Sequence, residues 1–465
     1  MKNKYKPFFY EKKKTSFRKI LLIIISAAAF LTYTAFQIPG IRQIIAEPLF
    51  ACGSFLVNAA HDLFDATRMY HEPEKKPEVW TPLELPDRDV LFAESLENLS
   101  AVSQEDPLAA LRQTPTPSDY ARVADWEYLD PSMNYALNAS ESDKSEAEDV
   151  RLVPPVFEHA DLFSDGPAIL SAALRFWGVV ENQYHIAGKL HPDVLDPDCS
   201  FSEMEKYIAD SVPGYSAVTR INGDKNLLIG LLQKEIPVII RIGSSTPLRF
   251  WLKDDRFIAR YLLIHGYDSS TDSFYCQDTY SSNNRLISAD TLLADWYLFQ
   301  RTYMVLYPEE KETDIRDILS ENFYGELNLQ QAEYKFRTDS EILTENAFAQ
   351  YNYGAVLHRT GDEAGAWQYF QKASELSLPQ RYLNYLPDIL ETAFALGYAD
   401  DMDRMIDPNL RRNSHDEVLL VYSGWADILR GNTAEGAGKF ERAEKINPHN
   451  DLVLYAIKYK ETMLS

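Results

Sequence analysis

The stretch that decides the fold is "DGPAILSAALRFWG", which runs from Asp165 to Gly178. A tight Asp-Gly-Pro turn leads directly into a segment with amphipathic spacing, which predicts a helix over about residues 167–176. Asp is among the residues preferred at a helix N-cap, and Pro167 suits a first turn. The local pattern therefore makes Asp165 an amino-terminal cap, and the remainder of the chain decides whether it is anything more.

Residues 151–310 are expected to form one α/β domain around this helix. Four short runs of β-branched and aromatic residues, each bounded by turn residues, have the composition of strands. They are "PVIIRIG" (237–243), "RYLLIHGYD" (260–268), "SFYCQDTY" (273–280) and "TYMVLYP" (302–308). Two further helices are predicted over about 201–209 and 224–234. Because the helices come mainly before the strands, we expect an α+β domain with an antiparallel sheet.

Four stretches, in this order, resemble the papain-like cysteine peptidases of family 39, the bacteriocin-leader-processing group. They are "DGPAILSAALRFWG", "IPVIIRIG", "ARYLLIHGYD" and "YCQDTY". The resemblance implies a papain-like domain whose nucleophilic Cys begins the central helix, where the helix amino-terminus stabilises a thiolate. It also implies a His that takes the proton, an Asp that orients this His, and a Gln that helps to hold the oxyanion.

The residues at these family positions differ from the catalytic set. The resemblance places the nucleophile at Asp165, the oxyanion Gln at His159, the base at Arg260 and the orienting acid at Asp278. A carboxylate lacks thiolate reactivity, and an arginine is never a general base, because its pKa exceeds about 12. Only Asp278 keeps the family residue type, so the sequence predicts a peptidase-like domain without peptidase chemistry. The opposite charges of Asp165 and Arg260 predict an ion pair between them.

The thiols leave one alternative open. Cys276 lies two residues from Asp278 on a predicted strand and hence on the same face, so it is a candidate displaced nucleophile or a buried apolar filler. His265 is an odd number of residues from Arg260, on the opposite face, and is not expected to replace the base. The chain has three cysteines, Cys52, Cys199 and Cys276, without CxxC spacing, so neither a structural metal nor a cofactor is expected.

Residues 311–465 read as helices with an internal repeat. "NYGAVLHRTGDEAGAWQYFQKASEL" and "SGWADILRGNTAEGAGKFERAEKINP" both have small residues and a phenylalanine at the spacings of a tetratricopeptide repeat. The positions are Gly354, Ala366, Phe370 and Ala373 in one unit, and Gly424, Gly436, Phe440 and Ala443 in the other. The small residues would let paired helices approach while Phe fills the space between them. We expect tetratricopeptide-like repeats with a concave docking surface, and a generic helical bundle is the alternative.

The amino-terminal part predicts a membrane anchor. Residues 1–19 form a basic tail, and residues 20–36 are an uncharged apolar run just long enough to span a bilayer. The positive-inside rule leaves the tail in the cytoplasm and places the rest outside. A cleaved signal peptide is the alternative. Residues 37–150 read as a juxtamembrane segment followed by an acidic linker rich in Pro and Ser.

Charge excludes one class of partner. The formal net charge is −24, and the first 19 residues are basic, so the remainder of the chain is still more acidic. Such a surface repels nucleic acid. The predicted function is that of a single-pass cell-membrane protein, its larger part extracytoplasmic. Its peptidase-like domain would be inactive and would bind a peptide or protein, or serve as a scaffold. The alternative is an active cysteine hydrolase that uses Cys276.

Overall fold

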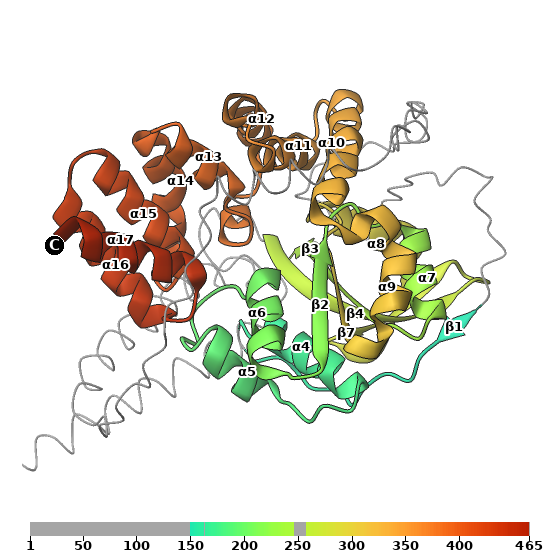
Figure 1. The fold of residues 1–465 in the computed structure, drawn as a ribbon. Coiled ribbons are helices and arrows are strands. Elements are labelled where there is room, and N and C mark those ends of the chain that lie inside the picture. The colour runs from blue at the N-terminus through green and yellow to red at the C-terminus, as the bar shows by residue number, and fades with distance from the viewer. Residues whose placement is uncertain (1–148, 162, 246–256, 465) are drawn as a thin grey trace, which may run out of the picture. The chain divides into compact units, whose positions relative to one another are not determined.

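A seven-stranded antiparallel sheet organises the first half of the described chain (Figure 1). The computed structural model describes residues 149–161, 163–245 and 257–464. The strands follow the order β2-β7-β3-β4-β5-β6, and β1 pairs with β4. Their bounds are Val150–Arg151 (β1), Tyr215–Arg220 (β2), Val238–Ser245 (β3), Phe257–Asp268 (β4), Ser273–Asp278 (β5), Ser282–Ser288 (β6) and Tyr303–Pro308 (β7).

Helices cover both faces of this sheet (Figure 1). On one face, Ile239, Tyr261 and Leu263 pack with residues of α4 (Asp165–Phe176), α5 (Gln183–Leu190) and α6 (Phe201–Ser211). On the other face, Ile240 and Leu262 pack with residues of α7 (Lys225–Gln233), α8 (Ala289–Tyr297) and α9 (Glu312–Leu319). Alternate residues of one strand thus enter two separate cores, as the pleat of a strand dictates. The antiparallel α+β domain expected from the sequence is confirmed.

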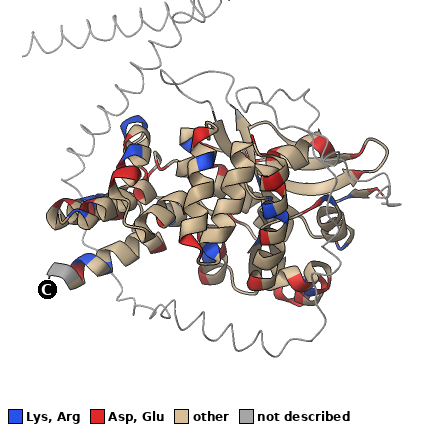
Figure 2. Cartoon of the chain, turned by 90° about the horizontal axis from the view of Figure 1, so that it is seen from above, with Lys and Arg blue, Asp and Glu red and all other residues tan. Residues whose placement is uncertain are grey.

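The second half is helical throughout, as expected. Short 3₁₀ segments separate several of the helices: η5 (Glu309–Lys311), η6 (Ser320–Phe323) and η7 (Gln380–Asn384). The helices are α10 (Gly325–Ile342), α11 (Ala347–Arg359), α12 (Glu363–Glu375), α13 (Asp388–Ala395), α14 (Ala399–Arg412), α15 (Glu417–Leu429), α16 (Thr433–Ile446) and α17 (Asp451–Leu464). Acidic and basic residues are interspersed along the helices visible in Figure 2.

Two helix pairs use the small residues that the repeat pattern singled out. A Cβ atom added to Gly354 of α11 would lie 3.0 Å from the ring of Phe370 of α12. A Cβ atom added to Gly424 of α15 would lie only 2.5 Å from the ring of Phe440 of α16. In both pairs, the missing side chain is what lets the phenylalanine ring lie against the neighbouring backbone.

The sheet and the helical half share a hydrophobic core. Phe257, the first residue of β4, is completely buried among aromatic rings of the helical half. Its ring centroid lies 5.9 Å from that of Phe348 and 5.6 Å from that of Tyr382. The boundary predicted between residues 310 and 311 separates the strand-containing sequence from the purely helical sequence. It does not separate two hydrophobic cores, because side chains from both sides of it pack together.

The predicted anchor, residues 20–36, and nearly all of the predicted linker lie outside the described residues. Among the helices that the structure describes, none has the length and apolar character needed to span a bilayer.

Candidate functional site

The positions singled out by the resemblance gather where α4 begins and β5 ends. Asp165 is the first residue of α4, and its side chain turns to the sheet. Its Oδ2 atom accepts a hydrogen bond from the backbone N–H of Tyr261 at 2.6 Å, and its Oδ1 accepts one from the hydroxyl of Thr279. The N-cap residue of α4 is Ser164, whose side chain makes no capping bond. The interpretation of Asp165 as a helix cap is therefore wrong, because its carboxylate serves the sheet and not the helix.

The reason lies in the length of β5. The register of β4 with β5 stops at Leu262 opposite Asp278, so β5 offers no acceptor for the next N–H groups of β4. An unsatisfied buried N–H is costly, and the Asp165 carboxylate supplies the missing acceptor for Tyr261. Burial raises the pKa of Asp165 to about 6, although its hydrogen bonds with Thr279 and Tyr261 act to lower that pKa. The group is thus mainly ionised at neutral pH and fully engaged.

Arg260 is engaged as well, but with a different partner from the one predicted. Its guanidinium forms an ion pair with Asp278, whose side chain is completely buried. The second oxygen of Asp278 accepts a hydrogen bond from Arg285 at 2.7 Å. The expected Asp165–Arg260 ion pair is not formed, because the sheet backbone and Thr279 occupy the Asp165 carboxylate. Asp278 therefore holds two cations where the resemblance places an acid that orients a histidine.

His159 and the unpredicted Tyr280 complete the site. The backbone N–H of Ala160 donates to the carbonyl of Thr279 at 3.1 Å, which brings this segment beside the end of β5. The ring of His159 then lies edge-on to that of Tyr280, with centroids 6.0 Å apart. The Tyr280 ring also carries the Arg260 guanidinium at 4.8 Å and remains 40% exposed. Tyr280 gives this site an exposed aromatic surface. The sequence does not predict this role, because a single tyrosine after a strand is a common pattern.

Gln183 fixes the His159 segment from the helix side. This buried side chain donates through Nε2 to the carbonyl of His159 at 2.8 Å and accepts from the N–H of Asp161 at 3.0 Å. Both amide atoms are thereby committed to the backbone. Gln183 was not predicted from the sequence, because the two segments are brought together only by the fold.

Both described thiols, those of Cys199 and Cys276, are buried. Cys276 is completely buried in the core between the sheet and α7–α8. Burial raises the pKa of its thiol to about 12, so the group is protonated at neutral pH. Burial likewise raises the pKa of Cys199 well above its usual range. The displaced-nucleophile hypothesis for Cys276 disagrees with this environment, since the reactive species is an accessible thiolate.

His265 is also a core residue. It is completely buried, and its Nε2 atom lies 3.0 Å from the carbonyl of Asn283. Burial lowers the pKa of its imidazole. Among the described residues, no group of three or more His, Cys, Asp or Glu side chains is arranged to hold a metal ion.

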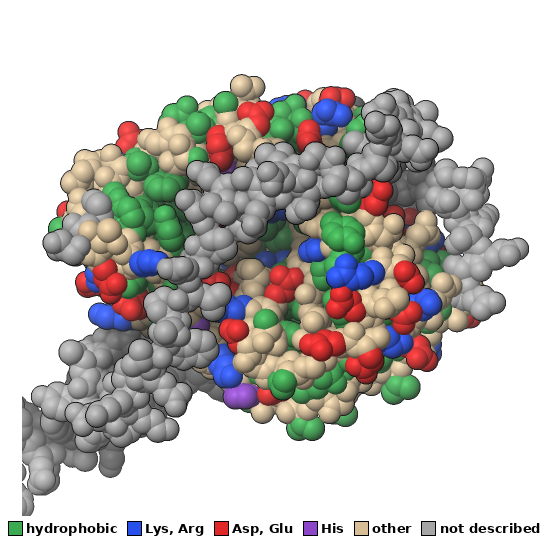
Figure 3. Space-filling model, viewed as in Figure 1, with side chains coloured by type: hydrophobic (Ala, Val, Ile, Leu, Met, Phe, Trp, Pro, Cys, Tyr) green, Lys and Arg blue, Asp and Glu red, His purple; other side chains and the backbone are tan. Residues whose placement is uncertain are grey.

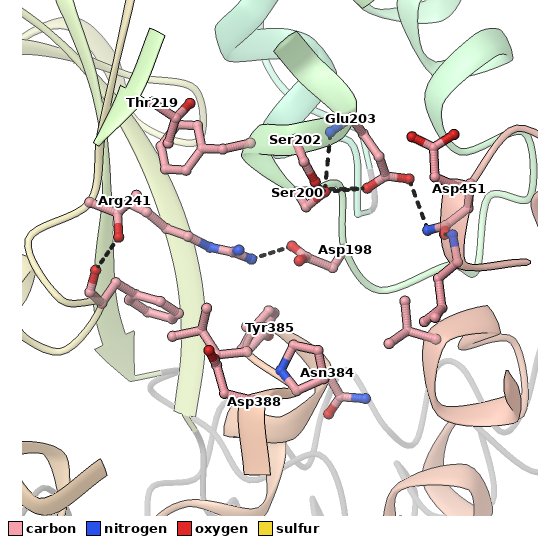
Figure 4. Close-up of a pocket in the computed structure, with 18 of the residues that line it drawn as sticks. Asp198, Ser200, Ser202, Glu203, Thr219, Arg241, Asn384, Tyr385, Asp388 and Asp451 are labelled. Atoms are coloured by element: carbon pink, nitrogen blue, oxygen red, sulfur yellow. Dashed lines mark hydrogen bonds and ion pairs between the residues drawn. The ribbon is translucent and has the colours of Figure 1, made fainter. Parts of the chain in front are cut away.

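A separate cavity of about 610 Å³ lies between the sheet domain and the helical half (Figure 4). Arg241 of β3 enters it and forms an ion pair with Asp198. The guanidinium lies 4.9 Å from the ring of Tyr261, 5.0 Å from that of Phe299 and 5.1 Å from that of Tyr385. This cavity was not predicted, because its walls come from segments that lie far apart in the sequence, between Asp196 and Leu452.

The chain was compared with solved structures, with curated proteins and with the sequence profiles of known families. A C39-like peptidase from Bacillus anthracis shares 14% identity with the chain and has a TM-score of 0.27, covering 35% of this chain and 98% of its own. Among curated proteins, none matches. Residues 166–304 match the sequence profile described as the Peptidase_C39 like family. This profile match supports the papain-like, C39-peptidase-like domain expected from the sequence for this part of the chain.

Proposed function

We propose that this protein is a catalytically inactive, peptidase-like binding protein, anchored in the cell membrane by residues 20–36. Its larger part would be extracytoplasmic, and it would hold a peptide or a protein segment without cleaving it. The observation that carries the proposal is that Asp165 and Arg260, at the family positions of the nucleophile and the base, both make structural contacts within the domain. Asp165 completes the hydrogen bonding of β4, and Arg260 neutralises a buried carboxylate.

We infer that neither residue acts as a base or a nucleophile. Both carboxylate oxygens of Asp165 already accept hydrogen bonds from the neighbouring sheet and from Thr279. An arginine stays protonated at any physiological pH, so it cannot take a proton from a nucleophile. Burial and the raised pKa of both described thiols make a substitute nucleophile unsuitable. What remains beside these positions is the exposed ring of Tyr280, flanked by His159 and Arg260, and such a polar and aromatic surface suits recognition.

The helical half would supply the second docking surface. We propose that it is a tetratricopeptide-like array, supported by the glycine–phenylalanine contacts of Gly354 with Phe370 and of Gly424 with Phe440. Stacked helix pairs present extended concave surfaces to protein segments. The acidic character of the chain favours partners other than nucleic acid.

One experiment separates binding from hydrolysis. The full chain, in a nonionic detergent, is incubated with a defined mixture of peptides, and mass spectrometry follows both the peptides retained and any cleavage products. We expect retention without cleavage. Tyr280→Ala should reduce retention, whereas Tyr324→Ala, which removes another exposed ring, should not. Cleavage that disappears in Cys276→Ser or Cys199→Ser would establish the hydrolase alternative. If no peptide is retained, the proposed peptide binding is wrong and a purely structural scaffold is the remaining function.

A further inference from the structure

The cavity beside Arg241 holds more acid than its bases can neutralise. Eight carboxyl groups and four Lys or Arg side chains line it, together with His449, whose pKa is lowered by partial burial. The four bases are already engaged: Lys206 with Asp451, Arg241 with Asp198, Arg359 with Asp388, and Arg220 with the backbone carbonyls of Asn322 and Phe323. These bases therefore leave part of the acid in the cavity wall without a counter-charge.

The unmatched acids form one group, which we call the carboxyl cluster: Asp196, Glu203, Asp416 and Glu417. Within the part of the chain that the structure describes, none of the four forms a salt bridge with a basic side chain. Glu203 and Glu417 share two amide donors. The Nδ2 atom of Asn450 lies 3.3 Å from Glu203 Oε1 and 3.0 Å from Glu417 Oε1, and Asn447 lies 3.2 and 3.3 Å from the same two oxygens.

Asp196 supplies an independent sign of a missing partner. Its side chain is 1% exposed, and no N–H or hydroxyl group of the described residues donates to its Oδ2 atom. The side chain shares a hydrogen bond with the carboxyl group of Glu417, which two carboxyl groups can do only through a proton held between them. A buried carboxylate oxygen without a donor is rare, because the lost hydration is not replaced. Burial raises the pKa of Asp196 well above its usual range, and the neighbouring charge of Glu417 raises it further. A cation in this cavity would satisfy the oxygen and offset the repulsion together.

We propose that this cavity binds an ammonium or guanidinium group, held by Asp196 and Glu417 of the carboxyl cluster. The inference goes beyond the proposed function, since neither Asp165 nor Arg260 lines the cavity. Nitrogen cations suit the cluster because they donate several hydrogen bonds to carboxylates without requiring the ordered ligand set of a metal.

The solvent access and the aromatic lining of the cavity suit such a group. The cavity reaches solvent at its rim, where the side chains of Lys206 and Asp451 are 38% and 67% exposed. Phe201, Phe299 and Tyr385 add aromatic surface to the lining, which suits the aliphatic stem of a basic side chain or of a polyamine. On the face shown in Figure 3, acidic, basic and hydrophobic side chains are interspersed. Selective binding would therefore report on the cavity and not on a uniformly charged surface.

The test is a titration of the full chain by calorimetry at pH 8, in moderate salt. Two probes distinguish the sources of the cation: spermidine, and a short lysine peptide compared with its Nε-acetylated form. Asp196→Asn and Glu417→Gln keep the side-chain shape and remove one charge each. Glu375→Gln removes an exposed charge that lies outside the cavity lining and is the matched control.

We expect saturable binding of at least one probe, weakened about tenfold or more by Asp196→Asn and by Glu417→Gln, and unchanged by Glu375→Gln. Binding of spermidine alone identifies a free polyamine, and binding of the unacetylated peptide alone identifies a basic peptide segment. Circular dichroism checks that each variant folds, and the two cluster variants are independent of each other. The inference is overturned if neither probe saturates, or if a folded cluster variant binds as tightly as the unsubstituted protein.

Discussion

The guanidinium of Arg260 lies against the carboxylate of Asp278, which is completely buried at the end of β5. A buried carboxylate needs a partner, and here it has two cations, since Arg285 lies 2.7 Å from its other oxygen. The position that the resemblance assigns to a proton acceptor thus holds a permanent positive charge whose role is structural.

Removing Arg260 should therefore destabilise the domain. We expect Arg260→Gln to lower the free energy of unfolding by about 1–3 kcal/mol, because Asp278 loses one of its two charged partners while remaining buried. Urea unfolding followed by circular dichroism measures the change. Arg404→Gln is the control, since Arg404 is largely exposed and pairs with Asp401 at the surface, where such pairs contribute at most about 1 kcal/mol. Equal effects of the two variants would contradict a structural role for Arg260.

Asp165 and Ser164 make a second matched pair. Asp165→Ala leaves the N–H of Tyr261 and the hydroxyl of Thr279 without their acceptor, and should cost about 1–3 kcal/mol of unfolding free energy. Ser164→Ala should stay within about 0.5 kcal/mol, because the Ser164 side chain makes no capping bond. If Ser164→Ala had the larger effect in the same urea experiment, the role of the Asp165 carboxylate as the acceptor for Tyr261 and Thr279 would be contradicted.

His358 should make stability depend on pH. Burial lowers the pKa of His358, but the hydrogen bonds with Glu391 and Glu363 outweigh burial and raise that pKa to about 9. A folded pKa above the unfolded value near 6.5 gives stability that is complete below about pH 6.5 and is lost as pH rises through 9. NMR titration should show the imidazole of His358 titrating well above 7. Glu391→Gln should move this pKa downward, whereas Glu375→Gln, at an exposed position, should leave it unchanged.

The sheet shows which elements a sequence announces. The strands β3, β4 and β7 were predicted within three residues of their observed ends, because they contain continuous apolar runs such as "VII" (238–240), which is buried on both faces of the sheet. The strands β2 and β6 were missed. They are the two edges of the sheet, and "YSAVTR" and "SNNRLIS" contain too few apolar residues to stand out from loops. An edge strand forms because it pairs with a neighbouring strand. This pairing cannot be predicted from the local sequence of the edge strand alone.

The candidate site likewise depends on contacts that the local sequence does not predict. The resemblance identified His159, Asp165, Arg260 and Asp278, and the fold brings them to one place. Their partners were beyond prediction, because Asp165 bonds with Tyr261 and Thr279 across 96 and 114 residues of chain. Opposite charge alone suggested that Asp165 and Arg260 would pair. The outcome depended instead on where β5 stops, which is a property of strand register and not of composition.

The contact between Gly424 and Phe440 offers the strictest test of helix packing in the second half of the chain. A Cβ atom at position 424 would lie 2.5 Å from the Phe440 ring and 2.9 Å from the carbonyl oxygen of Gly436, too close for either to remain in place. We expect Gly424→Ala to lower the free energy of unfolding by about 1–3 kcal/mol through overpacking. Gly438 lies on the same helix as Phe440, and a Cβ atom there would meet nothing within 4 Å. Gly438→Ala should therefore raise stability by about 0.5–1 kcal/mol, through the better helix propensity of alanine. Urea unfolding of both variants measures the two opposite signs, and a stabilising Gly424→Ala would show that α15 and α16 are not packed as closely as described.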